Sequence, residues 1–319
     1  MSQEKSHHSI RLMEFISENE YEQLNKLQEL CHSLDHANLK LELDYKLHFS
    51  VISKNHSRKI NEFIYYVDNT LVSYLGISSF GGNIAEINGM THPDWRRKGI
   101  FKRLFSLAAN ECQIRNFAKL LLLSDGKSGS GIDFIKSVGG AYDFSEYRMK
   151  LNNNLVYHGI YSVTLRTALK TDRTEIARQN ALFFNDTEEI SDNKKEEDKQ
   201  IIIGEGLPDQ IGEGINDPLE EDAPNSITYM VELKDEIIGK IKVEFGESTA
   251  FICGFGILSE HRGKGYGKAA LKETLGIILE KSIEDISLDV VCTNNNALNL
   301  YKTCGFEEQS IMNYYQFNL

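Results

Sequence analysis

The sequence contains no apolar stretch that approaches the length needed to span a membrane, and its first ten residues are polar. We therefore expect neither a transmembrane segment nor a signal peptide, and no membrane partner. Positive charge is scarce as well, because 47 acidic residues face 35 basic ones and give a net charge of −12. This acidic balance argues against nucleic acid as a partner. It would suit a cationic substrate such as an amine, although an acidic surface also serves solubility.

The cysteines show no metal-binding pattern. The chain has five of them, scattered among apolar positions without the spacing of metal ligands. This usage is typical of reduced thiols in the cytoplasm, so we expect a cytoplasmic protein without a metal. A length of 319 residues, with 41% hydrophobic and 26% charged residues, fits a soluble globular protein of two domains. Nothing in the sequence indicates an oligomeric state.

Two common phosphate-binding motifs are absent from a glycine-rich turn in the last third of the chain. The turn lies between a half-apolar run at 250–258, which predicts a strand, and an apolar-periodic run at 269–279, which predicts a helix. It is not a P-loop, because Lys268 is followed by alanine rather than serine or threonine. It is not a dinucleotide fingerprint either, because its glycines stand at alternate positions.

The turn nevertheless has the features of a phosphate site. Glycines at 263, 265 and 267 allow a tight backbone and present bare N–H groups at the positive end of a helix. The alternative is a solvated glycine loop with ordinary surface lysines. The basic residues in the turn are Arg262, Lys264 and Lys268.

A longer pattern includes this turn. The motif Arg262-x-x-Gly265-x-Gly267 is followed by Asn294-x-x-Ala297-x-x-x-Tyr301 and then by Gly305-Phe306. In this order and at about this separation, the motifs resemble those of the GNAT-type (GCN5-related) N-acetyltransferases. The resemblance implies acetyl-CoA as the cosubstrate. It also implies an amine acceptor, carried by a small molecule, a peptide or a protein.

The chain also contains an ungapped repeat. Arg96 and Arg262 are 262 − 96 = 166 residues apart, and the same shift pairs Gly99 with Gly265 along with many other features. One offset maintained over this length indicates two copies of one unit. The resemblance therefore extends over nearly the whole chain and implies a tandem member of the family.

The repeat predicts an N-terminal GNAT-like domain at 1–152 and a C-terminal GNAT domain at 153–319. The order of strands and helices makes each copy α+β, and the resemblance implies a mixed, mostly antiparallel sheet flanked by helices. The copies differ in their N-terminal parts. Residues 11–47 of the first copy and residues 164–184 of the second are predicted to be helical. Residues 185–225 are acidic and rich in turn formers, which predicts a solvated loop or a lid on the substrate side.

The resemblance also implies the roles of single residues. In GNAT enzymes the end of the fourth strand holds the pantetheine arm and the thioester, and the glycine turn holds the phosphates. Tyr301 matches the tyrosine that protonates the departing thiolate, although a tyrosine at an apolar helical position is commonly part of a core. The implied cofactor-binding residues are Phe255, Gly256, Ile257, Arg262, Gly263, Lys264, Gly265, Tyr266, Gly267, Lys268 and Asn294.

The resemblance identifies the general base less specifically than the other residues. The relatives that acetylate the alanine of ribosomal proteins place a carboxylate five residues before the asparagine, and Asp289 has that position here. Strand alternation sets Asp289 on the face opposite to Leu288 and Val290. The alternatives are that the proton leaves through water, with Asp289 a half-exposed strand residue, or that Glu244 is the base.

The first copy lacks the chemical groups of the second. Isoleucine cannot protonate a thiolate, so we predict that the first copy is structural or holds a cofactor and that the second performs the chemistry. The predicted reaction is direct attack of a primary amine on the thioester. The alternative function is a non-catalytic acyl-CoA-binding or interaction module. The replacements are Ile135 for Tyr301, Ser128 for Asn294, Leu123 for Asp289 and Phe101 for Gly267.

Overall fold

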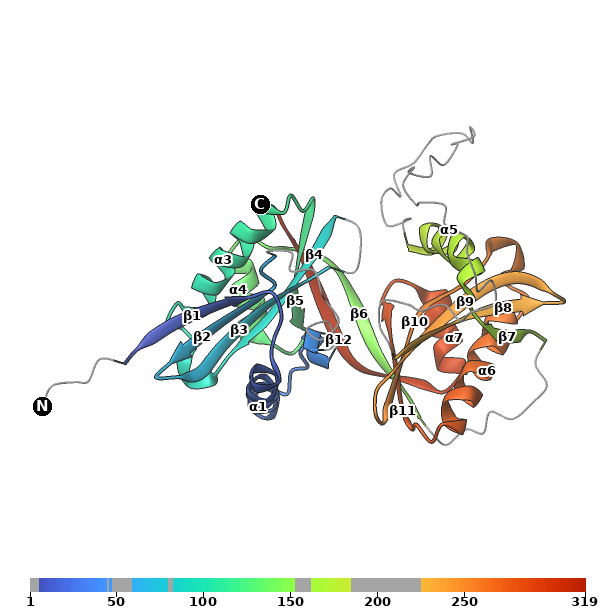
Figure 1. Ribbon diagram of the computed structural model, residues 1–319, viewed down its shortest axis with the longest axis horizontal. Helices are drawn as coiled ribbons and strands as arrows, with labels where there is room; N and C mark the ends of the chain where they lie inside the picture. Colours follow the sequence, from blue (N-terminus) through green and yellow to red (C-terminus); the bar gives the residue numbers. More distant parts are fainter. Residues whose placement is uncertain (1–5, 45, 48–58, 80–82, 153–161, 185–224) are drawn as a thin grey trace, which may run out of the picture. The chain divides into compact units, whose positions relative to one another are not determined.

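The chain forms two compact units in the computed structural model (Figure 1). Within the part of the chain that the structure describes, no helix is long and apolar enough to cross a membrane. The acidic segment predicted at 185–225 lies outside the described residues, except for its last residue. The described residues are 6–44, 46–47, 59–79, 83–152, 162–184 and 225–319. Unit 1 comprises residues 1–149, 289–298 and 307–319, and unit 2 comprises residues 150–288 and 299–306.

Unit 1 is built on one mixed β-sheet. Its strands are β1 (His8–Met13), β2 (Glu62–Val67), β3 (Thr70–Ser78), β4 (Ile84–Thr91), β5 (Lys119–Asp125), β6 (Ala141–Leu151) and β12 (Phe306–Phe317). Its helices are α1 (Glu18–Asp35), the short 3-10 turn η1 (Pro93–Trp95), α3 (Ile100–Ile114) and α4 (Gly129–Ser137). The strand order is β1-β2-β3-β4-β5-β12-β6. Strands β4 and β5 run parallel, whereas β1 to β4 are antiparallel to one another in succession and β12 is antiparallel to β5.

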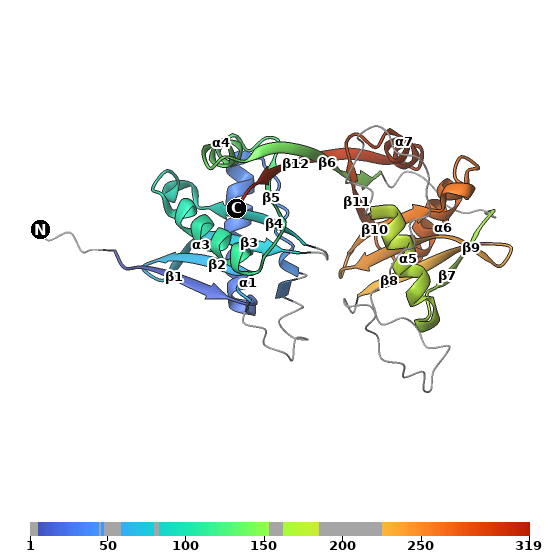
Figure 2. The ribbon, with the colours of Figure 1, turned by 90° about the horizontal axis from the view of Figure 1, so that it is seen from above.

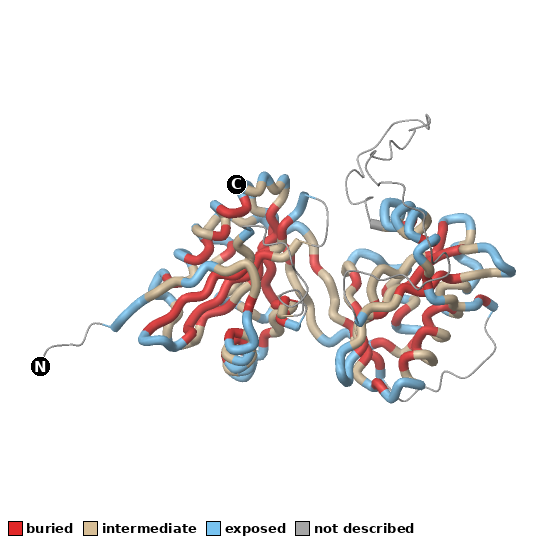
Figure 3. The backbone as a smooth tube through the Cα atoms, in the orientation of Figure 1, coloured by how far each residue is buried: buried red, intermediate tan, exposed pale blue. Residues whose placement is uncertain are grey.

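Two apolar cores cover opposite faces of this sheet, whose strands β2 and β3 are buried over most of their length (Figure 3). Helices α3 and α4 pack on one face, where Leu104 joins Phe63 in a buried cluster. Helix α1 packs on the other face, where Leu24 joins Ile64. Phe63 and Ile64 belong to different cores because successive residues of a strand point to opposite faces.

Helix α1 is shorter than the predicted helix at 11–47. It begins after Ser17, whose side chain accepts a hydrogen bond from the backbone of Glu20 while the Glu20 carboxylate accepts one from the Ser17 backbone. It ends at His36, which is in the left-handed region with φ 52°. The preceding residues form β1, which pairs with β2. This pairing depends on a partner distant in sequence, so the local helical pattern could not indicate it.

The strands of unit 2 form a portion of sheet that is also mixed. Its strands are β7 (Thr164–Thr167), β8 (Ser226–Leu233), β9 (Glu236–Phe245), β10 (Thr249–Ile257) and β11 (Asp285–Val291). Its helices are α5 (Arg173–Phe184), α6 (Tyr266–Glu280) and α7 (Asn295–Thr303), with 3-10 turns η2 (Lys170–Asp172) and η3 (Ser259–His261). The strand order is β11-β10-β9-β8-β7, with β10 and β11 parallel and the other neighbours antiparallel. Helices α5 and α6 lie on opposite faces of this sheet (Figure 2).

The helix predicted at 164–184 occupies only the second half of that range. Its first residues form β7, whose Arg166 guanidinium binds Glu232 on β8 and Asp172 on η2, just before α5. The Arg166 side chain holds the pKa of Asp172 below its usual value. These charge-assisted bonds join the short edge strand to its neighbour and to the helix that follows.

The predicted repeat is confirmed residue by residue. Shifting the bounds of η1, α3, β5 and α4 by 166 residues reproduces those of η3, α6, β11 and α7. Backbone contacts repeat as well, because Arg96 Nε donates to the Thr91 carbonyl and Arg262 Nε donates to the Ile257 carbonyl. The two copies therefore fold to the same local geometry around their arginine–glycine turns.

The last strand of the chain lies in unit 1. Residues Met312–Phe317 of β12 pair with Leu120–Asp125 of β5, and β6 is its other neighbour. The compact units therefore do not follow a single cut in the sequence.

Candidate active site

In unit 2, strands β10 and β11 part at the end of their parallel pairing. Their register runs from Thr249 opposite Asp285 to Ile252 opposite Leu288. Beyond that point the pairing of β10 with β9 shifts register, and Gly254 has a φ of 53°. The parting leaves the last residues of β10 as a strand edge, and such an edge can pair with an extended amide-bearing ligand.

The glycine turn follows this edge and starts helix α6. Gly265 is the N-cap of α6 with a φ of 85°, a conformation that favours glycine. The N–H groups of the first helical turn have no acceptor four residues earlier, so they are available to an anion. Arg262 is held by the Ile257 carbonyl at 2.7 Å, and Lys264 Nζ donates to the Glu260 carbonyl at 2.9 Å. The turn is thus a positively charged helix N-terminus, as the sequence predicts.

Tyr301 lies on α7 and is 9% exposed. Burial raises the pKa of its hydroxyl to about 12, with a smaller contribution from Cys304. Its ring packs edge-on against Phe306. The neighbouring Leu300 reaches the glycine turn, since a Cβ placed at Gly267 would lie 3.6 Å from the Leu300 side chain. Tyr301 is therefore a protonated phenol on the helix that packs against the predicted phosphate loop.

The edge Phe255-Gly256-Ile257 is divided between the two faces of the sheet. Phe255 and Ile257 pack with α6, whereas Gly256 lies beneath the ring of Phe183 from α5. Any side chain at Gly256 would overlap that ring. The Arg262 guanidinium also lies over Phe183, 5.9 Å from the ring centroid. Phe183 thus lies against the β10 edge that is predicted to hold the pantetheine arm. It belongs to neither the glycine-turn motif nor the Asn294–Tyr301 motif.

The two remaining predicted site residues, Asn294 and Asp289, belong to unit 1. Asn294 caps α7 through its side-chain oxygen, which accepts from the Ala297 N–H at 3.1 Å. Asp289 forms ion pairs with Arg148 and with Lys40, the latter at 3.3 Å. The structure therefore brings the glycine turn, the β10 edge and Tyr301 together in unit 2, and it commits Asp289 to two cations in unit 1.

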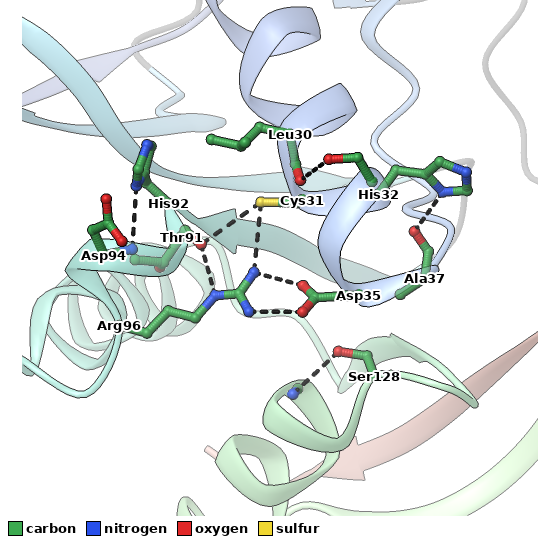
Figure 4. Close-up of polar contacts among 12 residues, drawn as sticks. Leu30, Cys31, His32, Asp35, Ala37, Thr91, His92, Asp94, Arg96 and Ser128 are labelled. Carbon is green, nitrogen blue, oxygen red and sulfur yellow. Dashed lines mark hydrogen bonds and ion pairs between the residues drawn. The ribbon is translucent and has the colours of Figure 1, made fainter.

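The corresponding turn of unit 1, where Arg96 contacts Asp35 (Figure 4), borders a cavity of about 430 Å³. Strands β4 and β5 part after Ile87 and Leu122, and residues from both faces of the sheet line the opening. Arg96 is fixed there by Asp35, with contacts of 2.9 and 2.6 Å, and by the Thr91 carbonyl. Phe101, which replaces a glycine of the second copy, lines the cavity and packs on Phe134.

Sequence patterns did not reveal the residues that contact Arg96 and Gly256. Asp35 stands at the end of a helix and Phe183 near the end of another, and neither belongs to a motif. A partial signal was available for β4, where Glu86 and Asn88 alternate with the apolar Ala85 and Ile87. That alternation indicates a polar face inside the sheet, and the structure places Asn88 against the segment that follows α1, where its side-chain amide donates to the Lys40 carbonyl at 2.8 Å.

Comparisons with known proteins match part of the chain to acetyltransferases. The model of the acetyltransferase (GNAT) family matches residues 199–306. The uncharacterized N-acetyltransferase YycN of Bacillus subtilis (strain 168) is 28% identical over 121 residues, which cover 36% of this chain and 74% of that protein. An N-alpha-acetyltransferase of Sulfurisphaera tokodaii is 27% identical over 100 residues, which cover 27% of this chain and 60% of that protein.

Two solved structures share the fold over nearly the whole chain. A GCN5-related N-acetyltransferase from Sphaerobacter thermophilus has a TM-score of 0.69 at 13% identity and covers 97% of this chain and 95% of its own. A tandem GNAT protein from the clavulanic acid biosynthesis pathway has a TM-score of 0.64 at 12% identity and covers 98% of both chains. Residues 199–306 therefore match the GNAT family of acetyltransferases, and the chain as a whole shares the fold of a tandem GNAT protein.

Proposed function

We propose that the protein is an acetyl-CoA-dependent N-acetyltransferase that acts on a primary amine, with its chemistry in unit 2. The observation that carries this proposal is the packing of α7 on the glycine turn. This packing places the N-terminus of α6, which is suited to phosphates, beside the helix that carries the buried, protonated Tyr301. Both lie where β10 and β11 part. Unit 1 has Ile135 where unit 2 has this phenol.

Each of these groups has a task in direct transfer. The N–H groups and cations of the turn hold the cofactor phosphates, and the β10 edge aligns the thioester arm. The amine nitrogen forms the new bond to the acetyl carbonyl carbon, and the carbon–sulfur bond then breaks. Tyr301 donates its proton to the leaving thiolate, which a phenol with a pKa of about 12 still carries at neutral pH. Thiol release in the presence of a panel of primary amines tests the activity.

The proton of the incoming ammonium has Asp289 or water as its acceptor. The carboxylate of Asp289 is already engaged by Arg148 and Lys40, so it is less available to accept a proton from a substrate. We therefore expect Asp289→Asn to lower kcat/KM by less than about tenfold, below the ~10²-fold typical of a lost general base.

Steady-state kinetics of Asp289→Asn beside Asp285→Asn measure this effect. Asp285 is a suitable control because it lies on the same strand and its pair with Lys150 is half exposed. A hundredfold loss confined to Asp289→Asn would assign the base role to Asp289.

A second function, acyl-CoA binding by unit 1, has support of its own. The cavity beside Arg96 and Gly99 opens where β4 and β5 part, as the corresponding strands do in unit 2. We expect calorimetric titration with CoA to give two sites per chain and Gly99→Glu to remove one of them. A single site that survives Gly99→Glu would show that unit 1 does not bind CoA.

A further inference from the structure

The cavity of unit 1 beside Arg96 has largely apolar walls. Side chains from both faces of the sheet line it, and α3 and α4 contribute aromatic rings. Two of these rings, those of Phe101 and Phe134, pack edge-on with their centroids 4.8 Å apart. A volume of about 430 Å³ lies within the range of sites for small molecules. The apolar side chains that line the cavity include Leu39, Ile87, Phe101, Phe105, Phe134 and Ile135.

The polar side chains inside this cavity already have partners in unit 1. Arg96 and Asp35 neutralise each other through contacts of 2.9 and 2.6 Å (Figure 4). The Ser128 hydroxyl accepts a hydrogen bond from the backbone of α4. Because these groups are satisfied, the inner side chains offer a ligand apolar contact rather than charge or hydrogen bonds. The other inner polar side chains bond to neighbouring carbonyl or hydroxyl groups, and they are Asn88, Thr91 and Ser124.

The mouth of the cavity is polar and exposed. Arg97 and Lys102 line it, and their side chains make no ion pair with any residue that the structure describes. Asp133 supplies the opposite charge there, so two cations face one carboxylate. The mouth therefore favours a negative group, while the interior favours an apolar one. The exposed polar residues of the lining are Arg97, Lys102, Ser130, Asp133 and Ser137.

We propose that this cavity holds the alkyl chain of an amphipathic anion, with the anionic head group at the exposed mouth. An alkyl chain needs no hydrogen bond from the inner walls, and its burial is favourable because it leaves water. The acyl chain of an acyl-CoA and a free fatty acid share this chemistry. Only the first of these sources rests on the acyl-CoA binding proposed above for unit 1. The site takes no part in the transfer proposed for unit 2.

The second copy lacks these apolar walls. Under the shift of 166 residues, unit 2 has a glycine or a polar residue at four of the apolar lining positions of unit 1. A preference for chains longer than acetyl is therefore expected of unit 1. The replacements are Gly256 for Met90, Gly267 for Phe101, Asp289 for Leu123 and Tyr301 for Ile135.

Tryptophan fluorescence of the full chain tests the proposal without any transfer reaction. Trp95 is the single tryptophan of the sequence, and it lines this cavity. Its emission is followed during titration with acetyl-, butanoyl-, hexanoyl- and octanoyl-CoA, with CoA itself as the reference for absorption by the nucleotide. The dissociation constant is expected to fall about two- to fourfold for each added methylene group. Equal constants for acetyl-CoA and octanoyl-CoA would overturn the proposal and leave CoA binding by unit 1 intact.

Octanoate and octylammonium distinguish the source of the chain and the charge of the head group. Octanoate is expected to cause a saturable change in Trp95 emission, and octylammonium should bind about fivefold more weakly because the cations at the mouth repel it. A response to octanoate but to no CoA thioester would identify a free fatty acid as the source and refute only acyl-CoA binding by unit 1. No response to octanoate or octanoyl-CoA, or tighter binding of octylammonium, would overturn the proposal.

The Phe101→Gln variant measures the contribution of the wall. The ratio of the affinities for octanoyl-CoA and acetyl-CoA should fall about fivefold, because a polar amide replaces an apolar contact of the chain. Phe117→Gln is the control, since Phe117 is also partly buried against the same core but does not line the cavity. An unchanged ratio in a folded Phe101→Gln variant would contradict the proposal. The chain-length series on the unaltered protein decides it if that variant does not fold.

Discussion

Replacing Tyr301 with phenylalanine is expected to lower the turnover of acetyl transfer about a hundredfold, the usual size of a lost general acid. The apparent affinity for acetyl-CoA should stay within about twofold, because the ring and its packing against Phe306 remain. Burial disfavours the tyrosinate and raises the pKa of Tyr301 to about 12. The hydroxyl therefore stays protonated through the neutral range, and its ionisation should cause no loss of turnover until strongly alkaline pH.

Thiol release at saturating amine, measured over a series of acetyl-CoA concentrations, separates turnover from affinity. Tyr229→Phe provides the control, since Tyr229 is also buried in unit 2 and burial also raises its pKa. It lies on β8 rather than on α7. Unchanged turnover in Tyr301→Phe, or an equal loss in both variants, would remove the acid role from Tyr301.

The substitution Gly265→Glu is expected to reduce kcat/KM for acetyl-CoA by more than a hundredfold. A side chain at φ 85° introduces strain of about 1–2 kcal/mol. The added carboxylate also places negative charge at the helix N-terminus where the phosphates are proposed to bind. A Cβ at this position would meet no atom within 4 Å, so the loss would not come from a steric clash within the protein.

Gly99→Glu is a closely matched control. Gly99 begins α3 as Gly265 begins α6, its φ is 77°, and a Cβ there would also meet no atom within 4 Å. Both variants therefore carry the same strain and the same change of charge. Transfer that survives Gly99→Glu but not Gly265→Glu would support chemistry in unit 2. The reverse result would move the chemistry to unit 1.

The repeat could be predicted from the sequence in detail because it depends on local signals. Turn glycines, apolar periodicity and the arginine before each turn all act within a few residues, and they recur with one spacing. The bounds of α3 and α6 consequently agree to the residue once the shift is applied. The positive helix N-terminus at Gly265 was predictable for the same reason.

Features that depend on distant partners were not predictable. The helix predicted from residue 11 includes the end of β1, because only the pairing with β2 defines that strand. Asp289 has the expected strand position, yet its chemistry is set by Arg148 and Lys40, which lie far away in the sequence. Phe183 likewise reaches Gly256 from another element. Side-chain contacts of this kind follow from packing, which one sequence does not reveal.

The position of β12 has a consequence for biosynthesis. Because β12 lies between β5 and β6, the strands of unit 1 lack an inner neighbour until residues 306–317 have been made. Unit 1 therefore cannot be completed before unit 2 has been translated, contrary to the usual N-terminal-first order. A fragment that ends at residue 152 would expose the open edge of β5 and is expected to aggregate, whereas the full chain covers that edge with its own end.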